Sequence, residues 1–202
     1  NLILPDVRLD RLHTLWQEAK AAGLATPNVG LLTDIIACPG GDFCSLANAK
    51  SIPIAESIQR RFDDLDYLHD LGEININISG CMNSCGHHHV GHIGILGVDK
   101  DGDEWYQVSL GGADGSTLSG PSAPGKVIGP SFAADEVADV VEAVIDTYLG
   151  ARIGSSERFI ETVRRLGLAP FRAAADGQRR STASAHTAAA ATATAAAAAS
   201  AS

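Results

Sequence analysis

The four cysteines of the chain are the residues whose spacing points most directly to chemistry. They form two pairs within residues 38–85: Cys38 and Cys44 are spaced as C-x5-C, and Cys81 and Cys85 as C-x3-C. Gly, Pro and Asn surround both pairs and allow the backbone to turn tightly around a bulky ligand. Four thiolates that converge on one point suit an iron–sulfur cluster or a zinc ion.

Three interpretations of these cysteines compete. Disulfides are disfavoured because the residues between the pairs read as a helical run and a strand, and 202 residues can bury a core without covalent staples. Structural zinc prefers tighter C-x2-C pairs, yet the triple His87-His88-His89 keeps it in consideration. A [4Fe–4S] cluster is the interpretation that the spacing favours, although cluster spacings vary widely.

The residues around the cysteines narrow this choice. The strings ACPGGDFCSLA, ISGCMNSCGHHHVGHIGILG and YQVSLGG closely resemble the assimilatory nitrite/sulfite reductase haemoprotein family, and the resemblance covers residues 1 to about 172. It implies six-electron reduction of sulfite to sulfide or of nitrite to ammonia. It also implies that a [4Fe–4S] cluster is held by Cys38, Cys44, Cys81 and Cys85, with Cys85 bridging to the iron of a sirohaem.

The resemblance implies further site residues. Asn83 matches an Asn that the family has between its second pair of cysteines, and Gly111 and Gly112 match a turn that packs near the sirohaem; for all three, an ordinary turn remains the alternative. The histidines are expected to line the cofactor or to bond neighbouring loops, and no ligand role is assigned to them; they are His87, His88, His89 and His92.

The resemblance also implies partners. The electron donor would be a ferredoxin or a flavoprotein, and the cationic groups that bind sulfite or nitrite would lie in the half of the enzyme preceding this segment. The chain alone is therefore expected to be inactive. Two other functions stay in consideration: a related sirohaem-type enzyme of corrin synthesis, and a non-catalytic iron–sulfur or zinc-binding module.

Composition sets broad limits. The net charge of −9 argues against a nucleic-acid partner, which requires a basic surface. No apolar run approaches the length of a membrane span. The beginning NLILPDVRLD has no signal-peptide pattern and reads as an internal start. Cysteines suited to metal thiolates favour the reducing cytoplasm.

The elements that position the cysteines are expected to form an α+β fold, a mixed sheet with flanking helices. Three parts are predicted: residues 1–34 as the end of a ferredoxin-like domain and a linker, 35–172 as the cluster-and-sirohaem domain, and 173–202 as a low-complexity tail. In the first part, a strand over residues 1–7 is expected to precede a helix that ends at Gly23. Trp16 is expected to be a core residue on the apolar face of this helix.

Further elements follow from periodicity. Helices are predicted from Ser45, from Ser51 as N-cap, from Ser131 as N-cap and from Ser155, and Pro170 closes the folded part. The alternating EININIS over residues 73–79 predicts a half-buried strand that delivers Cys81 at its end. Residues 93–98 and 104–110 predict a hairpin, and residues 113–130 a loop.

Overall fold

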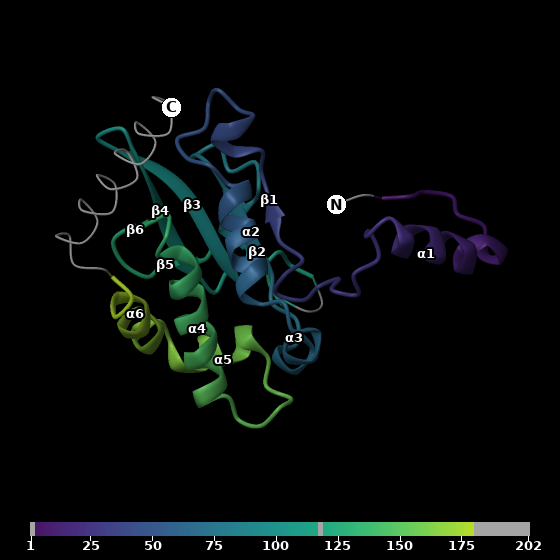
Figure 1. The fold of residues 1–202 in the computed structure, drawn as a ribbon. Helices are drawn as coiled ribbons and strands as arrows, with labels where there is room; N and C mark the ends of the chain where they lie inside the picture. Colours follow the sequence, from purple (N-terminus) through teal and green to yellow (C-terminus); the bar gives the residue numbers. More distant parts are fainter. Residues whose placement is uncertain (1–2, 117–118, 180–202) are drawn as a thin grey trace, which may run out of the picture.

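A six-stranded mixed sheet organises the computed structural model, which describes residues 3–116 and 119–179. Its strands follow the order β1-β2-β3-β4-β5, with β6 also paired to β4 (Figure 1). The strands are β1 Ile36–Ala37, β2 Ile76–Ser79, β3 Ile93–Lys100, β4 Asp103–Leu110, β5 Lys126–Val127 and β6 Phe132–Ala133. The expected α+β architecture is confirmed.

Parallel and antiparallel strands divide the sheet into two halves. β1, β2 and β3 run parallel, so their carboxyl ends meet at one edge. β3 and β4 form the predicted antiparallel hairpin. Its two-residue turn, Asp101 and Gly102, has positive φ at both positions, the backbone that closes tight hairpins. The parallel half carries both cysteine pairs.

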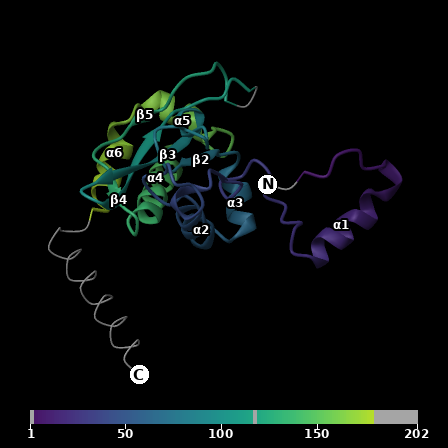
Figure 2. The ribbon, with the colours of Figure 1, turned by 90° about the horizontal axis from the view of Figure 1, so that it is seen from above.

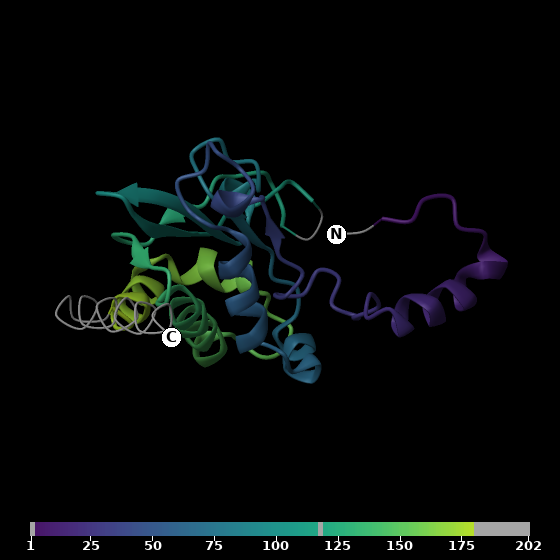
Figure 3. The ribbon, with the colours of Figure 1, turned by 45° about the horizontal axis from the view of Figure 1, so that its top comes forward.

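Helices cover one face of this sheet (Figure 3). α2 and α4 pack against each other, and α4 also packs on α5 and α6. The helices after the first are α2 Ile52–Arg61, α3 Leu65–Leu71, α4 Val137–Ala151, α5 Phe159–Leu166 and α6 Ala169–Asp176, with short 3-10 turns η2 Gly40–Asp42 and η3 His88–Val90. The predicted core residues of the second and fourth helices are buried. They are Ile54, Ile58 and Phe62 in and directly after α2, and Val137, Val140, Val141, Val144 and Tyr148 in α4.

The folded part continues beyond Pro170, where it was expected to end. Pro170 occupies the first turn of α6, a position that tolerates proline because no intrahelical N–H bond is lost there. Phe171 and Ala175 of this helix are fully buried. The Arg179 guanidinium lies 3.9 Å from the ring centroid of Phe132. The prediction that the folded part ends before residue 173 is therefore wrong, because α6 supplies core side chains and residues up to 179 contact the fold. The remainder of the predicted tail, residues 180–202, lies outside the described residues.

The first segment departs most from expectation. η1 Leu9–Arg11 and α1 Leu12–Ala21 form the predicted helix, with Gly23 at φ 72° behind it. The strand predicted over residues 1–7 is not formed at residues 3–7, since no other strand of the described chain lies beside them; residues 1 and 2 lie outside the described residues. α1 stands apart from the sheet (Figures 1 and 2), so Trp16 is 49% exposed and its predicted core role is wrong.

Several local predictions also need correction. No helix begins at Ser45, because residues 45–50 form turns that close the first cysteine loop. The strand at residues 76–79 is buried throughout, not half-buried, since it is central in the sheet. The predicted loop over 113–130 contains β5. Ser131 caps no helix, because β6 intervenes, and the last predicted helix begins at Phe159 instead of Ser155.

Phe171 tests the contribution of α6. Its ring packs against Phe159 with centroids 6.2 Å apart and is fully buried. Phe171→Ala should lower the free energy of unfolding by about 3–5 kcal/mol, because it leaves a cavity in the core. Phe43, which is 78% exposed, provides the matched control, and Phe43→Ala should change the value by less than about 0.5 kcal/mol. Urea denaturation followed by circular dichroism measures both; equal effects would contradict the packing of α6.

Candidate metal-thiolate site

Cys38 and Cys81 leave the sheet side by side. Cys38 directly follows β1, and Cys81 follows β2 after Gly80. The strands are parallel with Ala37 opposite Ile78, so both chains exit at the same edge. The Cys38 N–H donates to the Ile78 carbonyl at 3.0 Å and extends the pairing to the cysteine itself. The ends of parallel strands are where α/β sheets collect their sites.

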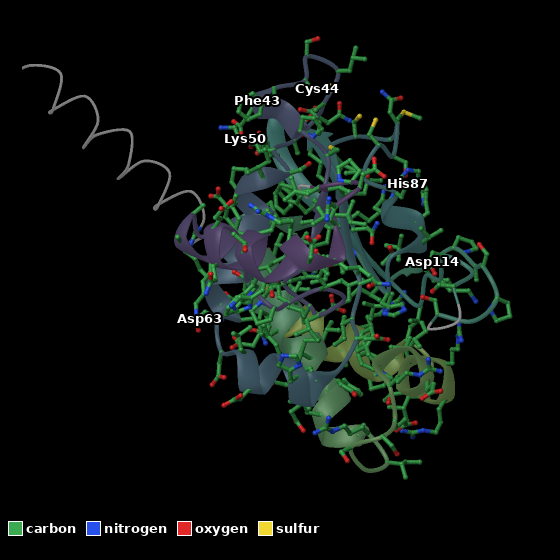
Figure 4. All side chains as sticks on the ribbon, turned by 90° about the vertical axis from the view of Figure 1, so that its right-hand side faces the viewer. Phe43, Cys44, Lys50, Asp63, His87 and Asp114 are labelled. Atoms are coloured by element: carbon green, nitrogen blue, oxygen red, sulfur yellow. The ribbon has the colours of Figure 1, made fainter. Side chains whose placement is uncertain are left out.

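Cys44 is brought to the same edge by a closed loop. The N–H groups of Asn48 and Ala49 both donate to the Gly80 carbonyl, at 2.9 and 3.0 Å. Within the loop, Gly41 donates to the Ala49 carbonyl, and Cys44 donates to the Gly40 carbonyl. The chain therefore returns after Cys44 and docks on the residue that precedes Cys81. Figure 4 shows Cys44 at this end of the molecule, where the sulfur atoms gather.

Cys85 sits in a turn that folds back over the end of β2. The Ser84 N–H donates to the Cys81 carbonyl at 3.2 Å. The Gly86 N–H donates to Ser79 Oγ at 3.1 Å, and Asn77 Nδ2 donates to the Gly86 carbonyl at 2.9 Å. Asn77 and Ser79 are buried, so these bonds are shielded from water. Sequence reasoning missed this role, because the alternating pattern placed Asn77 on the solvated face of a half-buried strand.

Glycines permit the close approach of these segments. A Cβ on Gly80 would lie 2.5 Å from the Ala49 carbonyl oxygen, and one on Gly86 would lie 2.0 Å from the Ile78 oxygen. In β3, a Cβ on Gly97 would lie 2.7 Å from Ala49 Cβ and 2.9 Å from the Gly80 oxygen. Backbone therefore packs on backbone beneath both cysteine pairs, and only glycine leaves the space that this requires.

The four cysteine residues differ in exposure. Cys81 is buried, Cys38 and Cys44 are partly buried, and Cys85 is exposed; all four are free thiols. Over residues 3–116 and 119–179, no three His, Cys, Asp or Glu side chains lie close enough to hold a single metal ion. A cluster spaces its thiolates more widely, because each thiolate binds a different iron. Four free thiols on three abutting backbone segments fit that donor set.

The Cys38 sulfur has two hydrogen-bond partners. The Gly80 N–H donates to Cys38 Sγ at 3.1 Å, and Ser51 Oγ lies 3.3 Å from the same atom. The Gly80 N–H and the Ser51 hydroxyl are both groups that can donate to a metal-bound thiolate. Ser51 was predicted only as an N-cap, so its contact with a cysteine is a feature that sequence reasoning missed.

The remaining predicted site residues lie on neighbouring turns. Asn83 is exposed in the turn between Cys81 and Cys85. Gly111 follows β4 with φ 83° and donates its N–H to the His92 carbonyl. A Cβ on Gly112 would lie 2.3 Å from the Gly91 oxygen, so the close approach expected there is made to the backbone of residues 89–91. A role for these residues toward a cofactor stays a prediction.

The histidines do bond neighbouring segments. The Asn75 N–H donates to His92 Nδ1 at 3.2 Å, which leaves Nε2 protonated to donate to Ser119 Oγ at 3.0 Å. Burial lowers the pKa of His92 to about 4. Ser84 Oγ contacts His88 Nδ1, and burial followed by the neighbouring His89 lowers the pKa of His88 to about 4. Both rings are therefore neutral near pH 7.

His87 has a different environment. It adopts left-handed backbone and is exposed. Its side chain lines a groove of about 340 Å³ beside β1 and β2, together with Asp34, Ile36, Asn75, Ile76, Asn77, Val90 and Asp114. Figure 4 shows His87 and Asp114 along one side of the molecule. The groove borders the turn that carries Cys85.

Four free thiols at one edge of a mixed α+β sheet are a donor set typical of metal–thiolate proteins. Comparison with known proteins specifies which class of metal centre. Residues 30–182 match the family of the nitrite and sulphite reductase 4Fe-4S domain, and the chain belongs to that family.

Individual relatives agree. "Sulfite reductase [ferredoxin] 2" of Mycolicibacterium paratuberculosis is 33% identical over 174 residues, which are 81% of this chain and 30% of the relative. A chloroplastic "Ferredoxin--nitrite reductase" of Zea mays is 30% identical over 127 residues, 57% of this chain and 21% of the relative. The chain spans less than a third of the length of these curated relatives.

Solved structures share the fold. The NirA protein of Mycobacterium tuberculosis has a TM-score of 0.63 at 26% identity, over 84% of this chain and 31% of that one. Dissimilatory sulfite reductase I has a TM-score of 0.62 at 14% identity, over 87% of this chain and 59% of that one, and so supports the fold alone. Among the described residues, no helix has the length and apolar character needed to cross a membrane.

The backbone contact at Gly80 generates a testable expectation. Gly80→Ala should lower the free energy of unfolding by about 1–3 kcal/mol, since the added methyl overpacks the contact with Ala49 and separates the two cysteine loops. Gly41→Ala is the matched control, because Gly41 also lies against Ala49 but its Cβ would meet no atom closer than 3.5 Å. Chemical denaturation of both variants measures the effect. Equal stability of the two would show that the loops do not depend on this contact.

His92 makes stability depend on pH. Its pKa of about 4 in the folded state lies below the value of about 6.5 expected when unfolded, so the unfolded chain binds the proton first. The corresponding stability is fully present above pH 6.5 and is lost as pH falls toward 4, by up to about 3 kcal/mol. His92→Gln should flatten this part of the profile, and His13→Gln on exposed α1 serves as the control variant. Unfolding measured from pH 4 to 7 checks this; parallel profiles for His92→Gln and the parent would contradict it.

Proposed function

We propose that this chain is the C-terminal cluster-and-sirohaem part of an enzyme that reduces sulfite to sulfide, or nitrite to ammonia, with six electrons. One observation carries the proposal: two cysteine pairs meet at the carboxyl ends of adjacent parallel strands in a chain of the nitrite and sulphite reductase family. The names of the relatives, sulfite reductase [ferredoxin] and ferredoxin–nitrite reductase, support both candidate substrates.

Cys38, Cys44, Cys81 and Cys85 are the proposed ligands of the [4Fe–4S] cluster. Their donor chemistry and the backbone contacts beneath them support this assignment. Cys85 is the proposed shared ligand of the sirohaem iron, and its exposure supports the choice because a bridging sulfur needs a free side. Asn83, Gly111 and Gly112 are proposed to border the sirohaem.

When bound, the two cofactors supply the electron transfer to the substrate. The chain's own residues position them. The bonds from Asn77 and to Ser79 fix the Cys85 turn, and the bonds of Asn48 and Ala49 to Gly80 fix the loop of Cys44. The Gly80 N–H donates to the Cys38 sulfur and would help to hold it in place as a cluster ligand. Cys81 is buried at one side of the site.

Substrate binding is proposed to require the remainder of the enzyme. An oxyanion needs cationic donors that converge on it. The nearest lysine along the chain, Lys50, pairs with Asp42. Arginines elsewhere in the described residues mostly hold carboxylates, as Arg61 does with Asp139 and Arg152 with Asp70. We therefore propose that turnover does not occur on this chain alone.

The electron donor is proposed to be a ferredoxin, because two relatives are named for it. A flavoprotein is the alternative donor. Free thiols at the site agree with a reducing compartment, and we propose the cytoplasm.

Replacement of Cys85 tests the proposal. After anaerobic reconstitution with iron and sulfide, the parent chain should contain iron and acid-labile sulfide in the ratio of a [4Fe–4S] cluster, with the matching visible absorption. Cys85→Ser should lose most of both, because it removes one cluster ligand. Ser84→Ala, at the neighbouring position, should retain them.

Sirohaem provides a second measurement. In the parent chain loaded with both cofactors, Mössbauer spectra should show magnetic coupling between the cluster and the sirohaem iron. The coupling should vanish in Cys85→Ser because the shared sulfur is absent. Intact coupling in that variant would overturn the bridging role, and zinc in place of iron in the parent chain would overturn the cluster.

A further inference from the structure

Ser51 is a helix N-cap residue whose hydroxyl does not cap its helix. It precedes α2, where a serine side chain ordinarily accepts from the N–H of the second or third helical residue. The second residue here is Pro53, which has no N–H. No capping bond is made by the Ser51 side chain. The hydroxyl lies 3.3 Å from Cys38 Sγ instead.

The Ser51 hydroxyl lies in a tightly packed, buried space next to two glycines. Ser51 is fully buried. A Cβ on Gly40 would lie 2.9 Å from Ser51 Oγ and 2.3 Å from its backbone nitrogen, and a Cβ on Gly80 would lie 3.1 Å from Ser51 Oγ. Two glycines from two cysteine loops thus leave the space in which the hydroxyl meets the sulfur. A buried hydroxyl that forms a hydrogen bond contributes to the stability of the fold, whereas a buried hydroxyl without a partner would lower it.

The direction of this hydrogen bond follows from the state of the cysteine. A metal-bound thiolate carries no proton and can only accept, so Ser51 Oγ is the donor. The Gly80 N–H donates to the same sulfur from a second direction, at 3.1 Å. Cys38 therefore receives one side-chain and one backbone hydrogen bond.

From this geometry we infer that Ser51 is a positioning residue that fixes Cys38 as a cluster ligand and raises the reduction potential of the cluster. The inference rests on the proposed function, since it takes Cys38 to be a ligand. Reduction adds one electron to the cluster and breaks no bond. The added negative charge spreads onto the thiolate sulfurs, so a donor to one of them stabilises the reduced state more than the oxidised state.

The test compares Ser51→Ala with the parent chain. Both are reconstituted with iron and sulfide, and the cluster is titrated with dithionite in the presence of redox mediators while EPR follows the reduced form. At the midpoint potential of the parent, the ratio of reduced to oxidised cluster in Ser51→Ala should be about threefold to tenfold lower. A tenfold change in this ratio corresponds to a shift of about 59 mV in the midpoint potential of a one-electron couple. The midpoint should therefore become more negative.

Two further variants separate this role from a structural one. Ser51→Thr keeps the hydroxyl and should restore the potential. Ser57→Ala removes a hydroxyl from the same helix, one that donates to the Ile54 carbonyl at 2.7 Å, and should leave the potential unchanged. Thermal unfolding of the metal-free variants shows whether they are folded. If Ser51→Ala is folded yet takes up no cluster, while Ser51→Thr does, the hydroxyl is required to position Cys38, which also supports the inference.

The contrary outcomes are distinct. An unchanged midpoint in Ser51→Ala, or an equal shift in Ser57→Ala, would overturn the role of Ser51 and leave the cluster assignment intact. A parent chain that takes up no [4Fe–4S] cluster would overturn the cluster assignment and this inference with it.

Discussion

The peptide group of Gly80 connects the parts of the thiol site. Its carbonyl accepts from Asn48 and Ala49, and its N–H donates to Cys38 Sγ. The first cysteine loop, its return segment and the end of β2 therefore meet at one residue that directly precedes Cys81. Gly80 is buried, and its carbonyl oxygen accepts two hydrogen bonds. Moving any of these segments would leave buried polar groups without a hydrogen-bond partner, which costs free energy because water cannot replace that partner. The relative positions of three cysteines follow from this one peptide.

The sheet explains why this point is rigid. β2 is central, is buried throughout, and is flanked by parallel neighbours on both sides. Ile76 and Ile78 join the same core as Ile93 and Ile95 of β3 and the helices α2 and α4. The burial of these side chains anchors the strand, and Asn77 and Ser79 use their side chains to hold the Cys85 turn. One short strand thus provides both core and site support.

Sequence patterns anticipated the parts of the fold that follow from periodicity. The core stripes of α2 and α4, the β3–β4 hairpin and the placement of Cys81 after a strand were all predicted, since apolar spacing and turn residues are local signals. The misses depend on distant contacts. Trp16 reads as a core residue, but nothing among the described residues covers α1. Pro170 reads as a terminator, but tertiary packing of Phe171 and Ala175 extends the fold past it. Ser51 reads as a cap, and only the structure shows its sulfur partner.

The exposure of the cysteines follows the chemistry proposed for each. Cys81 is enclosed, and Cys38 is reached by hydrogen bonds from the protein. Both suit ligands that serve the cluster alone, whose charge must be stabilised by fixed dipoles where water is excluded. Cys85 is exposed and lies in a turn whose backbone, not its sulfur, is held by Asn77 and Ser79 through Gly86. That arrangement fixes the position of the sulfur and leaves its other side free, as a thiolate shared between cluster and sirohaem requires.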